Sequence, residues 1–330
     1  MTGWMIALGA GAAVAAFSAL LVAFAGRMEN PNARDAAYVR WEQQRKPLVG
    51  GLALLMGWLL GAVLLTEARP DVQLSLWLGP VVLAFGLGLA DDARGLRPRH
   101  KLVGQLACGL CVLAEGAGIA ATGLSWLDGV LTVLWVVGLM NSLNMLDNMD
   151  GIVALVGAGL LAAGAVAGAA AGADLAWLGA GCLLGYFLLN RHPSRLYLGD
   201  SGSQLVGVLL ALWGIAYVWN VRPAGAAWPD TLLRVAWVFV VPLADTTLVT
   251  VARLLRGQSP AVGGRDHLTH HLRYVGLPVA AVGPVLGLVS FVGGLAAWAD
   301  WGRWPSLAGL LLLAAGGIAL YAWGGRRAAA

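Results

Sequence analysis

Residues 3 to 25 read GWMIALGAGAAVAAFSALLVAFA, an apolar stretch without a single charged side chain. About 20 such residues are enough to carry an α-helix across the hydrocarbon core of a bilayer. A cleavable signal peptide has a basic start and a shorter apolar core, whereas here the basic residues follow the stretch, from Arg27 to Lys46. We therefore predict an uncleaved membrane-spanning helix over residues 3–25.

The rest of the chain has the same character. Hydrophobic residues make up 59% of its 330 residues and charged residues only 12%, with a mean hydropathy of +0.76. About a quarter of the residues of a soluble domain are charged, so an ordinary soluble domain is excluded. The net charge of +4 is too thinly spread to indicate a nucleic-acid partner. All three cysteines lie inside apolar runs, which excludes a disulfide framework.

Further apolar runs follow the first one along the chain. They lie at about 48–66, 74–90, 102–120, 124–140, 152–170, 175–190, 202–219, 232–250, 278–299 and 304–323. The runs 124–140 and 175–190 are short for a span and end in polar sequence, which suggests a polar recess below the membrane surface. We predict an all-α integral membrane protein, a polytopic bundle of about 11 transmembrane helices that forms one domain over residues 1–330.

The basic residues fall almost entirely on one side of this arrangement. Only four of the 21 Lys and Arg lie in loops of the opposite side: Arg69, Arg222, Arg234 and Arg303. The positive-inside rule therefore predicts an external N-terminus and a cytoplasmic C-terminus. The cytoplasmic loops are then 26–47, 91–101, 141–151, 190–201 and 251–277.

The same cytoplasmic loops carry clusters of polar side chains, whereas acids on the opposite side stand singly. The densest cluster is NSLNMLDNMDG at 141–151. In a helix, Asn141, Asn144 and Asn148 would share a face, and Asn144, Asp147 and Asp150 would form an overlapping stripe. A run of helix caps is the alternative, but capping uses one or two such residues. We interpret the segment as the lining of one cavity.

Two further acidic clusters suit a metal ion. Asp91 and Asp92 precede a basic stretch that ends in Lys101. Carboxylates beside cations are the usual setting for Mg²⁺ bridged to phosphate oxygens, although a solvated turn at a helix end is the alternative. Asp200 lies in LGDSGS, where glycines let backbone amides approach an anion while the carboxylate holds a cation.

The last cluster is the histidine segment GRDHLTHHL at 264–272. The spacing of His267, His270 and His271 places them on one helical face. The neighbouring Arg265 and Arg273 disfavour a zinc ion, so phosphate binding fits better than metal binding, with a plain basic loop as the alternative.

Together these motifs resemble the polyprenyl-phosphate N-acetylhexosamine-1-phosphate transferases, glycosyltransferase family 4. The resemblance begins at KPLVGG (46–51) and rests on DD (91 and 92) with KLxxQ (101–105), NxxNxxDNxDG (141–151), LGDSGS (198–203), PLADT (242–246) and RDHLTHHL (265–272). Each motif is short, but their order along one membrane face is specific.

The resemblance implies a helical bundle in a bacterial-type plasma (inner) membrane, with a cytoplasmic active site. It implies transfer of a sugar-1-phosphate from a UDP-sugar to polyprenyl phosphate, giving a polyprenyl-diphospho-sugar and UMP. Mg²⁺ is the expected cofactor, with Mn²⁺ as a substitute. The expected partners are the UDP-sugar, the polyprenyl phosphate lipid and the membrane, without nucleic acid, and a homodimer is left open.

The resemblance also assigns roles to residues. Expected metal ligands are Asp200 and Asp91, and the expected catalytic residues are Asp91, Asp92, Asp147 and Asp150. The expected substrate-binding residues are Lys46, Lys101, Asn141, Asn144, Arg265, His267, His270 and His271. A general base is often proposed at the position of Asp92, but a phosphate monoester with a second pKa near 6 is already mostly ionised at neutral pH.

The identity of the sugar is less well defined. The longer HHHFE-like segment of the branch that uses UDP-MurNAc-pentapeptide is absent, and the loop is more similar to the WecA-type branch that uses UDP-GlcNAc. Thr269 departs from the HxHH spacing of that branch by one inserted residue. Another UDP-sugar, phospho-MurNAc-pentapeptide included, is therefore the alternative.

Two other classes of protein fit the sequence less well. A secondary transporter has ionisable groups near the bilayer midplane, whereas these spans hold almost no charge. A CDP-alcohol phosphatidyltransferase has a DGxxAR signature, and DGIVAL at 150–155 lacks its arginine.

Overall fold

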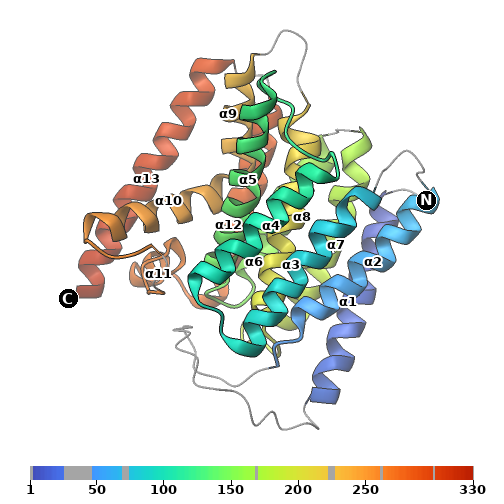
Figure 1. Cartoon of the computed structure of the whole chain (residues 1–330). Helices are drawn as coiled ribbons and strands as arrows, with labels where there is room; N and C mark the ends of the chain where they lie inside the picture. Colours follow the sequence, from blue (N-terminus) through green and yellow to red (C-terminus); the bar gives the residue numbers. More distant parts are fainter. Residues whose placement is uncertain are drawn as a thin grey trace.

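The computed structural model describes residues 3–25, 47–68, 74–167, 170–221, 227–260, 263–299 and 302–329, and all regular structure in them is helical. The elements are α1 (Gly3–Ala25), α2 (Gly50–Ala68), α3 (Ser75–Arg94), α4 (Pro98–Ala114), α5 (Ser125–Leu146), α6 (Ile152–Ala167), α7 (Ala170–Asn190), α8 (Gly199–Gly214), the π-helix η1 (Ile215–Trp219), α9 (Trp228–Val238), α10 (Val240–Leu255), α11 (Leu268–Tyr274), α12 (Val279–Trp298) and α13 (Arg303–Ala329). Figure 1 shows most of the long helices running side by side as a bundle.

The predicted polytopic membrane fold is confirmed, while the number of spans stays a prediction. Within the described ranges, eight helices are long and apolar enough to cross a membrane, and they match eight of the predicted runs. The other three runs correspond to α4, with 17 residues, α6, with 16 residues, and the bent pair α9–α10. The runs expected to be short, 124–140 and 175–190, are parts of the longer helices α5 and α7.

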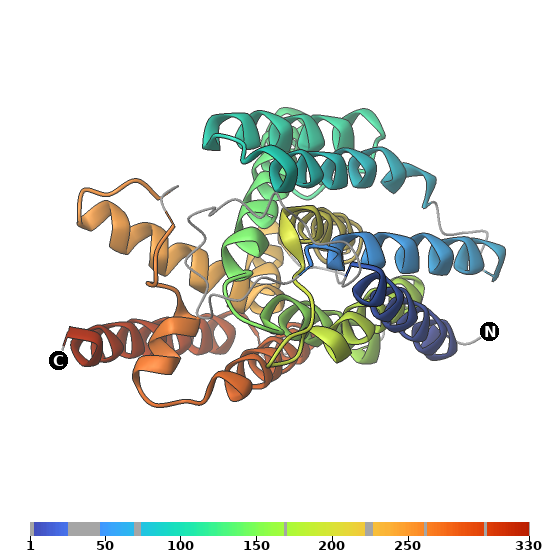
Figure 2. The same ribbon diagram turned by 90° about the horizontal axis from the view of Figure 1, so that it is seen from below.

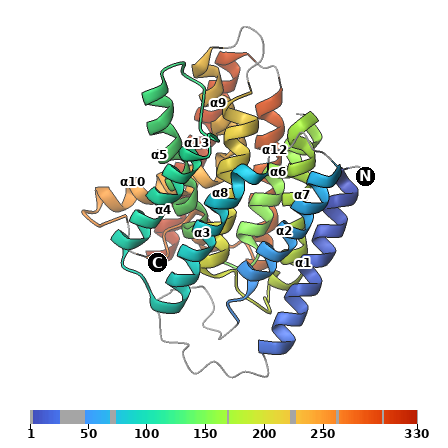
Figure 3. The same cartoon turned by 45° about the vertical axis from the view of Figure 1, so that its right-hand side comes forward.

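The prediction of one span over 232–250 is wrong in its shape. The helix breaks at Phe239, and α9 and α10 meet there at 87°. Pro242 lies in the first turn of α10 and has no N–H to donate to the carbonyl of Val238, so a continuous helix is disfavoured. The Phe239 ring is buried edge-on against Trp135 of α5, which anchors the corner. Figures 1 and 3 show α10 leaving the bundle to one side.

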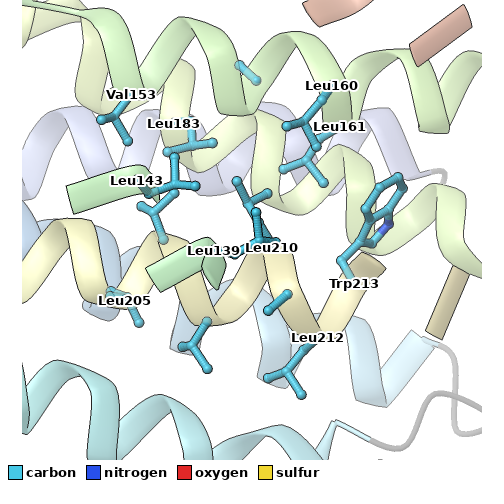
Figure 4. Packing of buried hydrophobic residues seen from close by; sticks show 14 of the residues in the cluster. Leu139, Leu143, Val153, Leu160, Leu161, Leu183, Leu205, Leu210, Leu212 and Trp213 are labelled. Carbon is cyan, nitrogen blue, oxygen red and sulfur yellow. The ribbon is translucent and has the colours of Figure 1, made fainter. Parts of the chain in front are cut away.

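The helix α8 forms the centre of the bundle. It packs against α2, α3 and α5, and 83% of the apolar window that it shares with η1 is buried. Figure 4 shows Leu205, Leu210 and Trp213 of α8 among leucines of α5, α6 and α7. Figure 2, which looks at the bundle from below, shows this helix enclosed by the others. Its first turn carries LGDSGS, so the most buried helix also presents a polar end.

Candidate active site

Four helix ends meet around one polar cluster. They are the C-terminal ends of α3 and α5 and the N-terminal ends of α4 and α8, and the turn between α3 and α4 lies at the lower end of the molecule in Figure 1. These ends belong to three of the loops predicted to be cytoplasmic. The convergence brings together motifs that lie far apart in the sequence, such as Asn144 and Asp200, 56 positions apart.

Lys101 links the two acidic motifs. Its ammonium group forms an ion pair with Asp91 Oδ2 and lies 3.5 Å from Asp200 Oδ2. The second oxygen of Asp91 accepts the N–H of Leu96 at 2.7 Å. Asn144 donates its amide to Asp200 Oδ1 and to Ser203 Oγ, the latter at 2.9 Å. Asp91, Lys101, Asn144 and Asp200, all expected site residues, are therefore neighbours.

A chain of buried amides supports this cluster from within the bundle. Asn141 donates to Gln105 Oε1 at 2.7 Å, and Gln105 donates to Asn141 Oδ1 and to Gln204 Oε1, both at 3.2 Å. Gln105 and Gln204 are each 1% exposed. These hydrogen bonds join the polar ends of α4, α5 and α8, while the recess expected from the sequence stays a prediction.

Asp92 is directed differently from Asp91. Its two carboxylate oxygens accept the backbone N–H groups of Asp200 and Ser201, at 2.7 and 2.9 Å. The adjacent residues Asp91 and Asp92 therefore serve different partners, because neighbouring side chains on a helix point about 100° apart.

Two glycines allow α3 and α8 to approach this closely. A Cβ on Gly88 of α3 would fall inside contact distance of Asp200 O and Ser201 Cα. Gly199, at the start of α8, has a φ of +74°, a conformation that side-chain-bearing residues rarely adopt. The motif LGDSGS requires glycine here for its backbone conformation.

The histidine segment forms a second cluster beside α10. His267 Nδ1 donates to Asp245 Oδ2 at 2.8 Å, and Asp245 Oδ1 accepts the N–H of Leu268 at 2.7 Å. Asp245 is fully buried, and its bond to Nδ1 fixes the orientation of the His267 imidazole. Thr269 Oγ1 donates to Asn148 Oδ1 at 2.7 Å, which joins the segment to the end of α5. The inserted Thr269 is thus a structural contact between the two motifs.

The other members of the segment lie in different surroundings. The His271 ring stacks on Tyr321 of α13 with a centroid distance of 3.9 Å. Burial is the main cause that lowers the pKa of His271. The side chain of Arg265, another expected site residue, is exposed. Burial and the neighbouring His267 lower the pKa of His270 to about 4, so this ring is neutral at physiological pH.

The neutral His270 predicts an acid-sensitive fold. The unfolded chain takes up this proton below about pH 6.5, the folded chain only below about pH 4, so stability falls as the pH drops through that window, by about 2 kcal/mol at pH 5. The melting temperature of purified protein, followed by tryptophan fluorescence, should therefore fall less between pH 7 and pH 5 in His270→Gln than in the wild type. His100→Gln, at an exposed position, should keep the wild-type slope. Parallel slopes for all three proteins would contradict the assignment.

Some expected site residues lie away from the acidic cluster. Asp150 accepts the N–H and Oγ–H of Ser194, at 3.1 and 2.8 Å, and lies 3.2 Å from His192 Nδ1, so it holds the turn between α7 and α8. Asp147 ends α5 and is buried. Lys46 lies outside the described residues, but the carbonyl of the next residue, Pro47, accepts the N–H of Tyr197 just before α8.

The sequence reasoning assigned no role to several residues of these clusters. Gln204 and Ser203 follow Asp200 by four and three residues, a helical spacing that marks them as neighbours. Asp245 is part of the motif PLADT, but the sequence assigns it no role of its own. Ser142 and Thr246, which hydrogen-bond to each other at 2.8 Å and tie α5 to α10, lie inside the motifs at 141–151 and 242–246, but the sequence assigns them no role.

The donor set of the acidic cluster fits Mg²⁺. Asp91 and Asp200 approach the same ammonium group, and an amide side chain lies against Asp200. Mg²⁺ is usually held by one or two carboxylates together with substrate phosphates, and it keeps several waters. In the part of the chain that the structure describes, no three His, Cys, Asp or Glu side chains form a complete metal site. A metal here would take its remaining ligands from the substrate and from water.

Comparisons with known proteins point in one direction. A family model described as "Glycosyl transferase family 4" matches residues 74–218, from the start of α3 into η1. The chain is 33% identical to a putative glycosyltransferase of Streptomyces coelicolor, over 81% of this chain and 64% of that protein. It is 31% identical to the decaprenyl-phosphate N-acetylglucosaminephosphotransferase of Mycolicibacterium smegmatis, over 76% and 70% of the two chains. It is also 31% identical to a phospho-N-acetylmuramoyl-pentapeptide-transferase of a Synechococcus strain, over 79% and 80%.

Proposed function

This chain belongs to glycosyl transferase family 4, and from that premise we propose that it transfers a sugar-1-phosphate from a UDP-sugar to a polyprenyl phosphate in the membrane. One phosphate oxygen of the acceptor attacks the phosphorus that bears the sugar, and the bond from that phosphorus to UMP breaks. The observation that carries the proposal is the convergence of Asp91, Lys101, Asn144 and Asp200 at the ends of α3, α4, α5 and α8.

The residues of the cluster divide the work by their chemistry. Lys101 supplies a positive charge between two carboxylates, where it can neutralise phosphate oxygens as they approach. Asn144 donates its amide to Asp200 and to Ser203 and thereby holds Asp200 in place. His267, oriented by Asp245, presents Nε2 toward substrate oxygens from the second cluster. Because the acceptor is already ionised, positioning and charge neutralisation supply most of the rate.

We propose Mg²⁺ as the cofactor, held by Asp200 and Asp91. When bound, the ion neutralises the charge of the diphosphate and of the departing UMP. The long apolar helices and the excess of basic residues in the loops at these helix ends support an active site on the cytoplasmic side of a bacterial inner membrane. UDP-sugars are made on that side, so the donor reaches the cluster from water and the acceptor from the lipid.

Removal of divalent metal should stop turnover. Treatment with excess EDTA is expected to reduce product formation to background, and added Mg²⁺ should restore it, because the diphosphate charge is otherwise unneutralised. The measurement is the formation of lipid product by purified protein in detergent. An enzyme with the same rate before and after chelation would refute the metal assignment.

We further propose UDP-GlcNAc as the donor. The short histidine segment supports this choice, and so does the similarity to an enzyme named as an N-acetylglucosaminephosphotransferase. The test is purified protein with Mg²⁺, undecaprenyl phosphate and a panel of UDP-sugars, followed by mass spectrometry of the lipid fraction. A polyprenyl-diphospho-HexNAc from UDP-GlcNAc alone is the expected result. Product from UDP-MurNAc-pentapeptide would move the chain to the other branch, and no product from any donor would refute the function.

A further inference from the structure

The helix α8 begins without a cap from its own sequence. The residue before it, Leu198, has no side chain that can accept a hydrogen bond from the first turn, and no such bond is made. The first backbone N–H groups of any helix need an acceptor from elsewhere. In α8 two of these groups, on Asp200 and Ser201, donate to the carboxylate of Asp92 on α3.

Asp92 and Asp200 are 108 residues apart in the sequence, and both oxygens of the Asp92 carboxylate take part in the contact. A negative charge at a helix N-terminus is stabilised both by the N–H groups and by the helix dipole. The site is closely fitted: a Cβ on Gly199 would lie 2.8 Å from Asp92 Oδ2. The close approach of α3 to α8 therefore depends on Asp92 and on the two glycines, Gly88 and Gly199.

The consequence falls on Asp200. Its own backbone N–H is one of the two held by Asp92, so the bond fixes the turn from which the Asp200 side chain projects. That side chain meets Asn144 and lies near Lys101, the neighbours that define the acidic cluster. Removal of the cap would free this turn while leaving every side chain of the cluster present.

We propose that Asp92 is a positioning residue, which caps α8 from α3 and thereby places Asp200, and that it does not accept a proton from the substrate. The inference rests on the proposed transferase function only for its effect on rate. The two adjacent aspartates then have different roles. Asp91 belongs to the acidic cluster, and Asp92 holds the backbone turn that carries Asp200.

The test compares Asp92→Ala with Asp92→Asn in purified full-length protein, by hydrogen–deuterium exchange of peptides that cover residues 199–204 and by turnover. Asp92→Ala should raise amide exchange there about tenfold, while Asp92→Asn, which keeps one of the two acceptor oxygens, should raise it less. Turnover should follow the same order, with a loss of roughly a hundredfold in Asp92→Ala and roughly tenfold in Asp92→Asn. Melting temperatures identify any variant that has not folded.

Asp91→Asn is the matched control on the same helix. Asp91 contacts Leu96 and Lys101, so this variant should lose turnover yet keep wild-type exchange at residues 199–204. Wild-type exchange in Asp92→Ala would overturn the proposal, as would equal inactivity of both Asp92 variants when Asp92→Asn exchanges like the wild type. The exchange experiment needs no substrate, so it tests the cap even if the donor panel shows that the transferase function is wrong.

Discussion

Replacement of Asp200 by Asn is expected to slow sugar-phosphate transfer about a thousandfold without unfolding the protein, because removal of one electrostatic contact to the reacting group typically costs about that much. The amide has the shape of the carboxylate, and the backbone cap at this turn does not involve the side chain. What is lost is the negative charge between Lys101 and Asn144. Turnover is measured by mass spectrometry of the lipid product, and folding by the melting temperature.

Asp230→Asn provides the matched control for this variant. Asp230 also lies in the first turn of a helix, α9. Its carboxylate pairs with Arg303, the first residue of α13. This variant should turn over like the wild type. If Asp200→Asn retained a rate near that of Asp230→Asn, Asp200 could not be an essential group of the site.

Gly88→Ala is expected to cost about a hundredfold in turnover, although Gly88 carries no chemistry and touches no substrate. The added methyl group would overlap the backbone of Asp200 and Ser201, which cannot move aside as a flexible side chain could. Overpacking of this kind costs about 1 to 3 kcal/mol, so the melting temperature should also fall. The displacement shifts Asp200 relative to Asn144 and Lys101.

Gly86→Ala on the same helix separates this effect from helix propensity. No atom lies within 4 Å of a Cβ placed there, so the variant should keep wild-type activity and gain slightly in stability. Equal activity of the two variants would show that α3 and α8 can move apart without affecting the site. Equal losses in both would show that alanine disturbs α3 itself.

The motif residues could be recognised from the sequence, but their partners could not. Asp91 and Asp92 look equivalent on paper, since both are acids at the end of an apolar run. The packing of α3 against α8 and α4 separates them, giving Asp91 to Lys101 and Asp92 to the backbone of α8. Asp150 shares the spacing of the site residues, but α5 already ends at Leu146, and Asp150 holds the turn at Ser194.

The break between α9 and α10 is a second feature whose geometry depends on tertiary contacts. Apolar composition correctly predicts helical structure within 232–250 but not the break at Phe239, for which Pro242 is the signal in the sequence. The direction of α10 after the break depends on the contact of Phe239 with Trp135 and on the bonds from Ser142 to the Pro242 carbonyl and from Thr246 to Ser142. That direction places Asp245 beside His267, a pairing that no sequence spacing indicates.

The sequence by itself determined that the chain is a helical membrane protein and that its polar motifs lie at one set of helix ends. These properties follow from local composition, because a bilayer admits long apolar helices and retains basic loops on one side. Tertiary structure alone decided that α8 is central, that Asp92 caps it, and that Asp91 and Asp200 meet at Lys101, with Asn144 against Asp200. Such contacts depend on which helix faces pack together, and that is set by close fit at residues such as Gly88, far apart in the chain.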